Sequence, residues 1–365
     1  MPDTLERTQQ ELDLQITLGP VLIVLKGNAD PEVERVYTRA QALCQRVGET
    51  PRLFTVLAGL STFYYGRGKH QTARELGEQL LGLAQRVQAP ALLLEAHLHL
   101  GRSLYFPGEL IAARMHLQQS LALYDPRQHH SNAFICGGSD PGVNGLCNEA
   151  FTLWSLGYPD QALKRSHAGL TLARELTQPS SLCVALGIAA LLHQLRGEIQ
   201  ATQRQTEEMI ALSREQGFLH MTPLGTVMQG WVLAEQGQVE EGIAKLRQGV
   251  ATSRATGAEA ALPYYLALLA LAYAKAGRVE EGLAVLTEAL DMVHESRRRV
   301  NEPGLYVLKG WLLLARSGDN QAEAESCFRH AIDIARRHAR PRDHRGRDRG
   351  RPPGSGFPFR THPGT

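Results

Sequence analysis

The chain has 365 residues, 43% hydrophobic but only 6% aromatic, and this length favours several domains or a repeat array over one ordinary core. Its 39 Lys and Arg residues nearly balance 37 Asp and Glu residues, and the net charge of +2 predicts no strong attraction to nucleic acid or to an anionic membrane. The charge is uneven: nine Arg and two Asp give residues 336–365 a charge of +7, while the rest of the chain carries −5.

The N-terminal ten residues are polar and lack the apolar segment of a secretory signal. No stretch of about 18 uninterrupted apolar residues occurs, so we expect no membrane span. Five scattered cysteines without a CxxC pair favour single buried thiols over disulfides or a zinc site. Together these features predict a cytoplasmic protein.

One pattern recurs along the chain: a glycine, a few turn residues, a small residue and an amphipathic run. Its clear copies are separated by 40, 49, 40, 40 and 40 residues, with a weaker first copy at Gly27 and a last one near Gly318. Apolar residues within each copy recur at helical spacing. The period therefore marks a repeated helical unit. The clear copies begin at Gly68, Gly108, Gly157, Gly197, Gly237 and Gly277.

Two columns of small residues keep a constant phase with these glycines. Seven residues before each glycine stand Ser61, Gly101, Ala150, Ala190, Gly230 and Ala270, with Gly310 one period later. Five residues after each glycine stand Ala73, Ala113, Ala162, Thr202, Gly242 and Gly282, and we favour Ala324 for this position in the last copy. Small side chains on successive helices let their backbones approach, and the glycine between them permits a tight turn. We predict an all-α fold built from helix pairs.

Prolines agree with this frame, because each stands 7 to 11 residues before a small residue of the first column. Proline is tolerated in the first turn of a helix, where its missing N–H would lack a partner in any case. We therefore expect a first helix to begin near each of Pro51, Pro90, Pro179, Pro223, Pro263 and Pro303.

The spacing small–x6–Gly–x4–small resembles the tetratricopeptide (TPR) repeat, as in Gly230, Gly237 and Gly242 or in Ala270, Gly277 and Gly282. The resemblance implies an α-solenoid, a right-handed superhelix of about eight helix pairs whose first helices line a concave groove. TPR repeats have 34 residues and this chain has a period of 40. HEAT repeats match the period better but do not require a small residue in this frame.

A closer resemblance covers residues 5–338 and rests on five segments. They are similar to the C-terminal TPR region of large bacterial signal-transduction ATPases of the P-loop (STAND) type, which often carry an adenylate or guanylate cyclase domain. The resemblance implies an interaction or sensor array, with catalysis located in an NTPase or cyclase domain encoded nearby. The segments are Leu5–Ile23, Thr72–Arg86, Leu156–His167, Gly230–Gly249 and Ala322–Arg337.

This chain contains no G-x-x-x-x-G-K-[ST] motif; the nearest segment, 66–70, lacks the glycine spacing and the magnesium-binding hydroxyl. We divide the chain into a repeat array, residues 1–338, and an Arg/Gly/Pro-rich tail, residues 339–365, that we expect to be disordered. A natural basic tail and a change of reading frame would both produce this composition. The nine extra residues between two copies fall in 124–145 and predict an inserted loop.

Candidate chemical sites are sparse. His129 and His130 precede Cys136 and Cys147, but their spacing matches no standard zinc site. No nucleophile stands in a pattern that specifies an adjacent base. We therefore expect no enzyme activity, no cofactor and no bound metal.

The resemblance to TPR proteins implies a different kind of site, a protein or peptide ligand in the concave groove. We expect a protein-interaction or sensor scaffold with no specific nucleic-acid partner. The alternative is a regulatory array that senses a small molecule in the same groove. The candidate contact residues on the first helices are Tyr64, His193, Gln229 and Tyr264.

Overall fold

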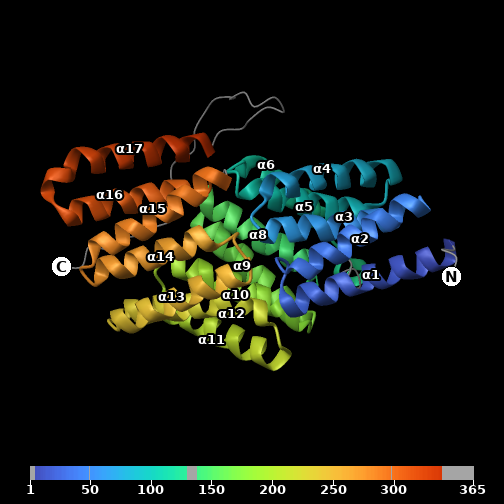
Figure 1. The fold of residues 1–365 in the computed structure, drawn as a ribbon, viewed down its shortest axis with the longest axis horizontal. Helices are drawn as coiled ribbons and strands as arrows, with labels where there is room; N and C mark the ends of the chain where they lie inside the picture. Colours follow the sequence, from blue (N-terminus) through green and yellow to red (C-terminus); the bar gives the residue numbers. More distant parts are fainter. Residues whose placement is uncertain (1–4, 49, 130–137, 297, 339–365) are drawn as a thin grey trace.

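The computed structural model describes residues 5–48, 50–129, 138–296 and 298–338, and these form helices without a strand. Sixteen of the helices pair into eight consecutive α-hairpins (Figure 1). The predicted tail, 339–365, lies outside the described residues. The pairs are α1 (Leu5–Lys26) with α2 (Pro31–Val47), α3 (Thr50–Gly66) with α4 (His70–Val87), α5 (Pro90–Tyr105) with α6 (Leu110–Leu123), α8 (Pro141–Ser155) with α9 (Pro159–Glu175), α10 (Pro179–Leu195) with α11 (Ile199–Gln216), α12 (Thr222–Glu235) with α13 (Val239–Ala255), α14 (Leu262–Lys275) with α15 (Val279–Ser296), and α16 (Glu302–Arg316) with α17 (Gln321–His338).

The prolines and glycines delimit these pairs. Each of the six expected prolines lies in the first turn of a first helix, for example Pro179 at the start of α10. In seven pairs the connecting glycine has a positive φ, as Gly237 does at +89°. The N–H of Gln238 then bonds to the carbonyl of Leu233 at 2.9 Å, which satisfies a carbonyl at the end of α12. The last pair differs, because a short 3-10 helix, η3 (Gly318–Asn320), connects α16 to α17.

The small residues lie where the two helices of a pair touch. A Cβ on Gly101 would lie 2.8 Å from Leu117 of the partner helix, four residues beyond Ala113. In the last pair a Cβ on Gly310 would contact Phe328, four residues beyond Ala324. This equal register places Ala324 at the small position of the last copy, and its side chain is buried.

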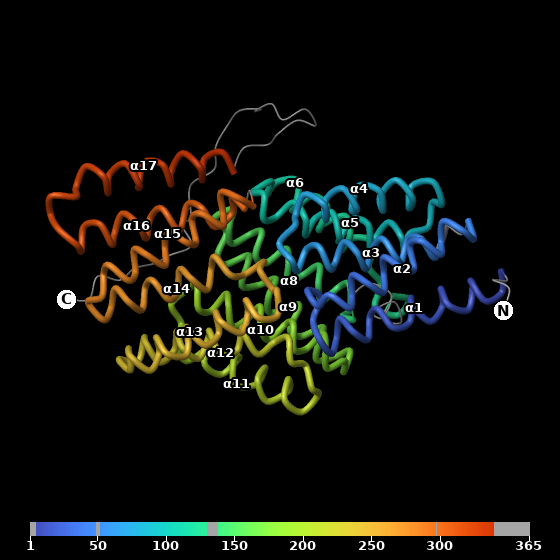
Figure 2. Tube along the Cα trace, in the orientation of Figure 1, coloured from blue at the N-terminus to red at the C-terminus, as the bar shows by residue number. Residues whose placement is uncertain are grey.

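The array curves until distant turns meet. Figure 2 shows α14–α17 beside α1–α6, with the middle pairs forming the rest of the curve. The N–H of Ala260 bonds to the carbonyl of Gly66 at 3.4 Å, and the N–H of Val300 bonds to the carbonyl of Phe106 at 3.1 Å. We call this contact zone, residues 66–70 and 106–108 against 257–260 and 298–300, the seam. It joins segments nearly 200 residues apart.

The inserted segment is shorter than predicted, because α8 begins inside it at Pro141. Its described part contains α7 (Pro126–His129), and residues 130–137 lie outside the described residues. Asp140 caps α8 by accepting hydrogen bonds from the N–H groups of Gly142 and Val143. The Tyr124 hydroxyl donates to the same carboxylate at 3.0 Å, so both ends of the insert are tied to one residue. Every helix of the described ranges is too short or too polar to span a bilayer.

Candidate functional site

A cavity of about 280 Å³ opens on the inner face of the curve, next to the seam. Its lining residues come from six of the eight first helices, α3, α5, α8, α10, α14 and α16, and from turns next to them. None of the lining residues belongs to a second helix. The lining residues are Tyr65, Tyr105, Phe106, Asn148, Phe151, Trp154, Ser155, Leu191, Leu195, Ala260, Ala261, Tyr264, Tyr265, Ala267, Val300, Asn301 and Leu305. We call this the aromatic cavity.

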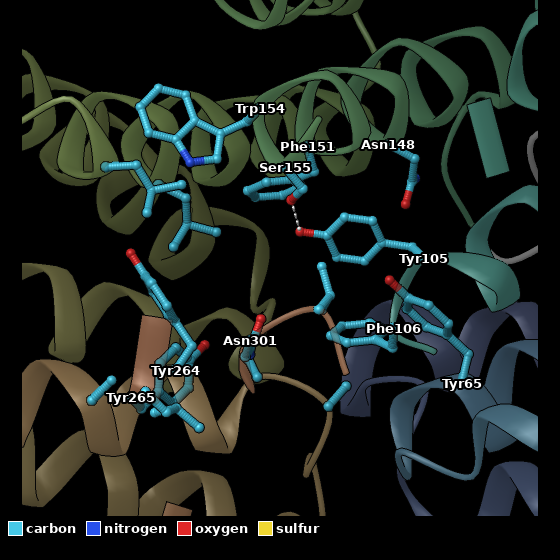
Figure 3. Close-up of a pocket in the computed structure, with 17 residues that line it drawn as sticks. Tyr65, Tyr105, Phe106, Asn148, Phe151, Trp154, Ser155, Tyr264, Tyr265 and Asn301 are labelled. Atoms are coloured by element: carbon cyan, nitrogen blue, oxygen red, sulfur yellow. Dashed lines mark hydrogen bonds between the residues drawn. The ribbon is translucent and has the colours of Figure 1, made fainter. Parts of the chain in front are cut away.

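Aromatic side chains cluster here from the C-terminal ends of α5 and α8 and from the N-terminal end of α14. Trp154 and Phe151 come from the C-terminal end of α8, and Tyr105 ends α5. In Figure 3 these rings lie on one side of the cavity, with Tyr264 and Tyr265 of α14 on the opposite side. The curve of the array therefore brings rings from separate repeats around one space.

A few polar atoms are distributed among the rings. The hydroxyls of Tyr105 and Ser155 lie 3.1 Å apart and form a hydrogen bond (Figure 3). Tyr264 donates a hydrogen bond to the buried amide of Gln194. The indole N–H of Trp154 is buried and has no hydrogen-bond partner among the described residues. A buried donor of this kind is costly unless a ligand or water accepts from it.

The cavity carries no formal charge. None of its lining residues is Asp, Glu, Lys, Arg or His. Burial raises the pKa of Tyr105 to about 12, and burial also raises the pKa of Tyr264 well above its usual value. The tyrosine hydroxyls therefore stay protonated at neutral pH, so they donate hydrogen bonds and bring no negative charge. Such a lining suits apolar or aromatic groups with one or two acceptors.

The four candidate contact residues occupy different places. Tyr264 lines the aromatic cavity. Tyr64 instead donates a 3.0 Å hydrogen bond to Glu34 of α2, and Nδ1 of His193 lies 2.6 Å from the Glu198 carboxylate at the start of α11. Gln229 lines a separate cleft of about 270 Å³ between α11, α12 and α13.

Trp154, Tyr105 and Phe106 were not among the candidate contact residues predicted from the sequence. The available signal was the position of these aromatic residues at the ends of first helices. That signal became interpretable only when the curvature of the array showed which ends converge. No three His, Cys, Asp or Glu residues of the described ranges are grouped as a metal site would require. His130 and Cys136, two of the four residues considered above as zinc ligands, lie outside those ranges.

No protein-family model matches the sequence. An uncharacterised protein of Rhizobium meliloti (strain 1021) is 24% identical over 324 residues. The match covers 87% of this chain but 31% of that protein, so the chain spans less than a third of its relative.

Three solved structures share the fold at low sequence identity. A Rap protein complexed with Competence and Sporulation Factor has a TM-score of 0.61 and 14% identity, covering 90% of this chain and 99% of that one. Cut9 in the APC/C hetero-tetramer Cut9–Hcn1 gives 0.60, 15%, 89% and 55%. The Rap conjugation gene regulator of plasmid pLS20 with the Phr* peptide gives 0.56, 11%, 90% and 95%. The chain is therefore a TPR-like α-solenoid, as its repeat pattern predicted.

Proposed function

We propose that this chain is a non-catalytic interaction array that binds a peptide, or an extended segment of a protein, in the aromatic cavity. The observation that carries the proposal is the convergence of six first helices on one uncharged, ring-lined cavity. Aromatic and aliphatic anchor residues bind best in pockets of this kind. Tyr105, Trp154 and Asn301 would supply the hydrogen bonds that orient the bound segment.

We further propose that the array is the regulatory part of a bacterial signal-transduction system with a P-loop ATPase or an adenylate cyclase. The resemblance of five segments to such arrays supports this, as does the greater length of the Rhizobium relative. Two proteins of similar fold were solved with Competence and Sporulation Factor and with the Phr* peptide. The expected partner is therefore a polypeptide whose binding changes the curvature of the array.

The test is selection of a displayed library of random 12-residue peptides on the full-length chain, followed by fluorescence anisotropy. Ala261→Phe puts a large side chain into the cavity, whereas Ala244→Phe makes the same change on the exposed face of α13. We expect selected peptides to carry apolar anchors and to lose about tenfold or more in affinity for Ala261→Phe alone. Equal binding to both variants would refute a site in the aromatic cavity.

A small-molecule ligand is the second candidate, favoured by the modest cavity volume and by the buried indole N–H of Trp154. Thermal unfolding with a panel of small aromatic compounds separates the two. A saturable rise in Tm that Ala261→Phe abolishes, with no peptide selected, would favour the small molecule.

A further inference from the structure

A second cavity, of about 360 Å³, lies at the seam. The α3–α4 turn and the start of α4, residues 67–72, form one wall. The other wall is formed by Glu259, by the end of α15, including Glu295, and by Arg298. Arg67, Lys69 and Arg298 bring three positive charges against the two negative charges of Glu259 and Glu295, a balance of +1. We call this the seam cavity.

The N-terminus of an 18-residue helix points its amides toward this cavity. Helix α4 begins at His70, and its N-cap residue, Lys69, makes no side-chain capping bond. The first amides of a helix have no intrahelical acceptor, and the helix dipole adds partial positive charge there. Both features favour an anion beside Gln71 and Thr72.

Two buried side chains of the seam cavity provide an independent observation. The side chain of Arg298 is only 2% exposed. Its Nη1 donates to the carbonyl of Glu259 and its Nη2 lies 4.0 Å from the Glu259 carboxylate, while its Nε has no hydrogen-bond partner among the described residues. The ring of His70, also 2% exposed, has no hydrogen-bond partner on either nitrogen among the described residues. Burying such donors is costly unless something accepts from them.

The lack of a side chain at Gly68 leaves room for the guanidinium of Arg298. Gly68 has a φ of +69°, and a Cβ on it would overlap the Nη2 atom of Arg298. The guanidinium therefore lies directly against the α3–α4 turn, beside the first amides of α4. Burial, with the nearby charge of Arg298, lowers the pKa of His70 to about 3, so its ring is neutral and offers one N–H donor.

We propose that the seam cavity binds the phosphate group of a small ligand, with Arg298, Lys69 and the first amides of α4 as donors. A phosphate dianion accepts several hydrogen bonds at once, which suits a guanidinium, an ammonium and backbone amides that converge from two walls. The ligand would bridge residues 67–72 to Arg298 and hold the seam closed. This site is separate from the aromatic cavity and does not depend on the function proposed for it.

The volume of the seam cavity, about 360 Å³, leaves room for a ligand larger than one phosphate group, and free phosphate and a nucleotide share the same recognition chemistry. The test therefore measures the Tm of the full chain with inorganic phosphate, with adenosine monophosphate and with adenosine, each against sodium chloride of equal ionic strength. We expect phosphate and the nucleotide to raise Tm saturably and adenosine to have no effect. Tighter binding of the nucleotide would identify a nucleotide ligand, whereas equal affinity would identify phosphate alone.

Variants locate the site. We expect Arg298→Gln to weaken phosphate binding about tenfold and Lys69→Gln, at an exposed position, to weaken it about threefold. Lys245→Gln removes a cation from the cleft between α11, α12 and α13 and should change nothing. Circular dichroism shows which variants fold. If Arg298→Gln does not fold, phosphate binding by Lys69→Gln tests the proposal. No phosphate effect beyond that of chloride, or unchanged binding in folded Lys69→Gln and Arg298→Gln, would overturn the proposal.

Discussion

The backbones of Gly230 in α12 and Gly242 in α13 touch. A Cβ on Gly242 would lie 2.7 Å from the Gly230 carbonyl oxygen, and a Cβ on Gly230 would lie 2.8 Å from the Gly242 carbonyl oxygen. Neither position has room for a methyl group, since its neighbour is backbone that cannot move away cheaply. This pair shows the physical meaning of the small residues that recur along the chain.

Replacing Gly242 with alanine should therefore destabilise the protein by about 1–3 kcal/mol, the usual cost of overpacking. Gly82→Ala, inside α4, is the matched control, because a Cβ there meets no atom of the described part of the chain within 4 Å. Relief of backbone entropy should make the control more stable by about 0.5–1 kcal/mol. Urea unfolding measures both changes. A destabilisation of Gly82→Ala equal to that of Gly242→Ala would contradict the packing argument.

A second pair of glycines separates backbone strain from the seam contact. Gly68 and Gly277 both lie two residues after the end of a first helix, with φ of +69° and +72°, but a Cβ on Gly277 meets no atom of the described residues within 4 Å. Alanine at either position pays about 1 kcal/mol for a left-handed backbone. Gly68→Ala must also displace the buried guanidinium of Arg298, so we expect it to cost about 1 kcal/mol more. Equal Tm values for the two variants would show that the Arg298 contact contributes nothing.

Acid should destabilise the protein through its buried histidines. Burial, with the nearby charge of Arg102, lowers the pKa of His99 to about 3, and Nδ1 of this ring lies 3.2 Å from the Ser61 hydroxyl. The unfolded chain binds a proton below about pH 6.5, whereas the folded chain does so only near pH 3. His99 therefore stabilises the fold fully above pH 6.5, and this contribution falls by about 1.4 kcal/mol per pH unit as pH decreases toward 3.

Urea unfolding between pH 7.5 and 5 measures this slope. His99→Gln should reduce the dependence of the free energy of unfolding on pH by the contribution of one histidine. His167→Gln, on the exposed face of α9, is the matched control and should keep the wild-type slope. Identical slopes in wild type and His99→Gln would show that protonation of His99 is not linked to unfolding.

The buried thiols should react only when the fold opens. The cysteines of the described ranges, Cys44, Cys147, Cys183 and Cys327, are buried, and burial raises the pKa of Cys147 to about 12. The thiolate is the reactive species, so native Cys147 should resist alkylation at pH 8. Mass spectrometry that resolves each site should find Cys147 labelled at the rate of unfolding. Labelling within minutes in native buffer would contradict its burial.

The sequence alone was sufficient to predict the helix pairs, because they follow from local physical chemistry. A proline in the first turn, a glycine that adopts positive φ and small residues seven before and five after it specify one α-hairpin without reference to the rest of the molecule. For the same reason the last pair could be placed in register by Ala324. The candidate contact residues were harder, since the concave wall had to be inferred from resemblance: Tyr264 lines the aromatic cavity, whereas Tyr64 and His193 contact second helices.

Tertiary structure alone decided where distant turns meet. The pitch of a solenoid is the sum of small rotations between successive pairs, and a small difference in each rotation moves the ends of the array by many ångströms. No local pattern records that sum, so nothing in the sequence placed Gly68 against Arg298 or Trp154 opposite Tyr264. Repeating residues determine the unit, while the accumulated geometry of eight units creates the two cavities.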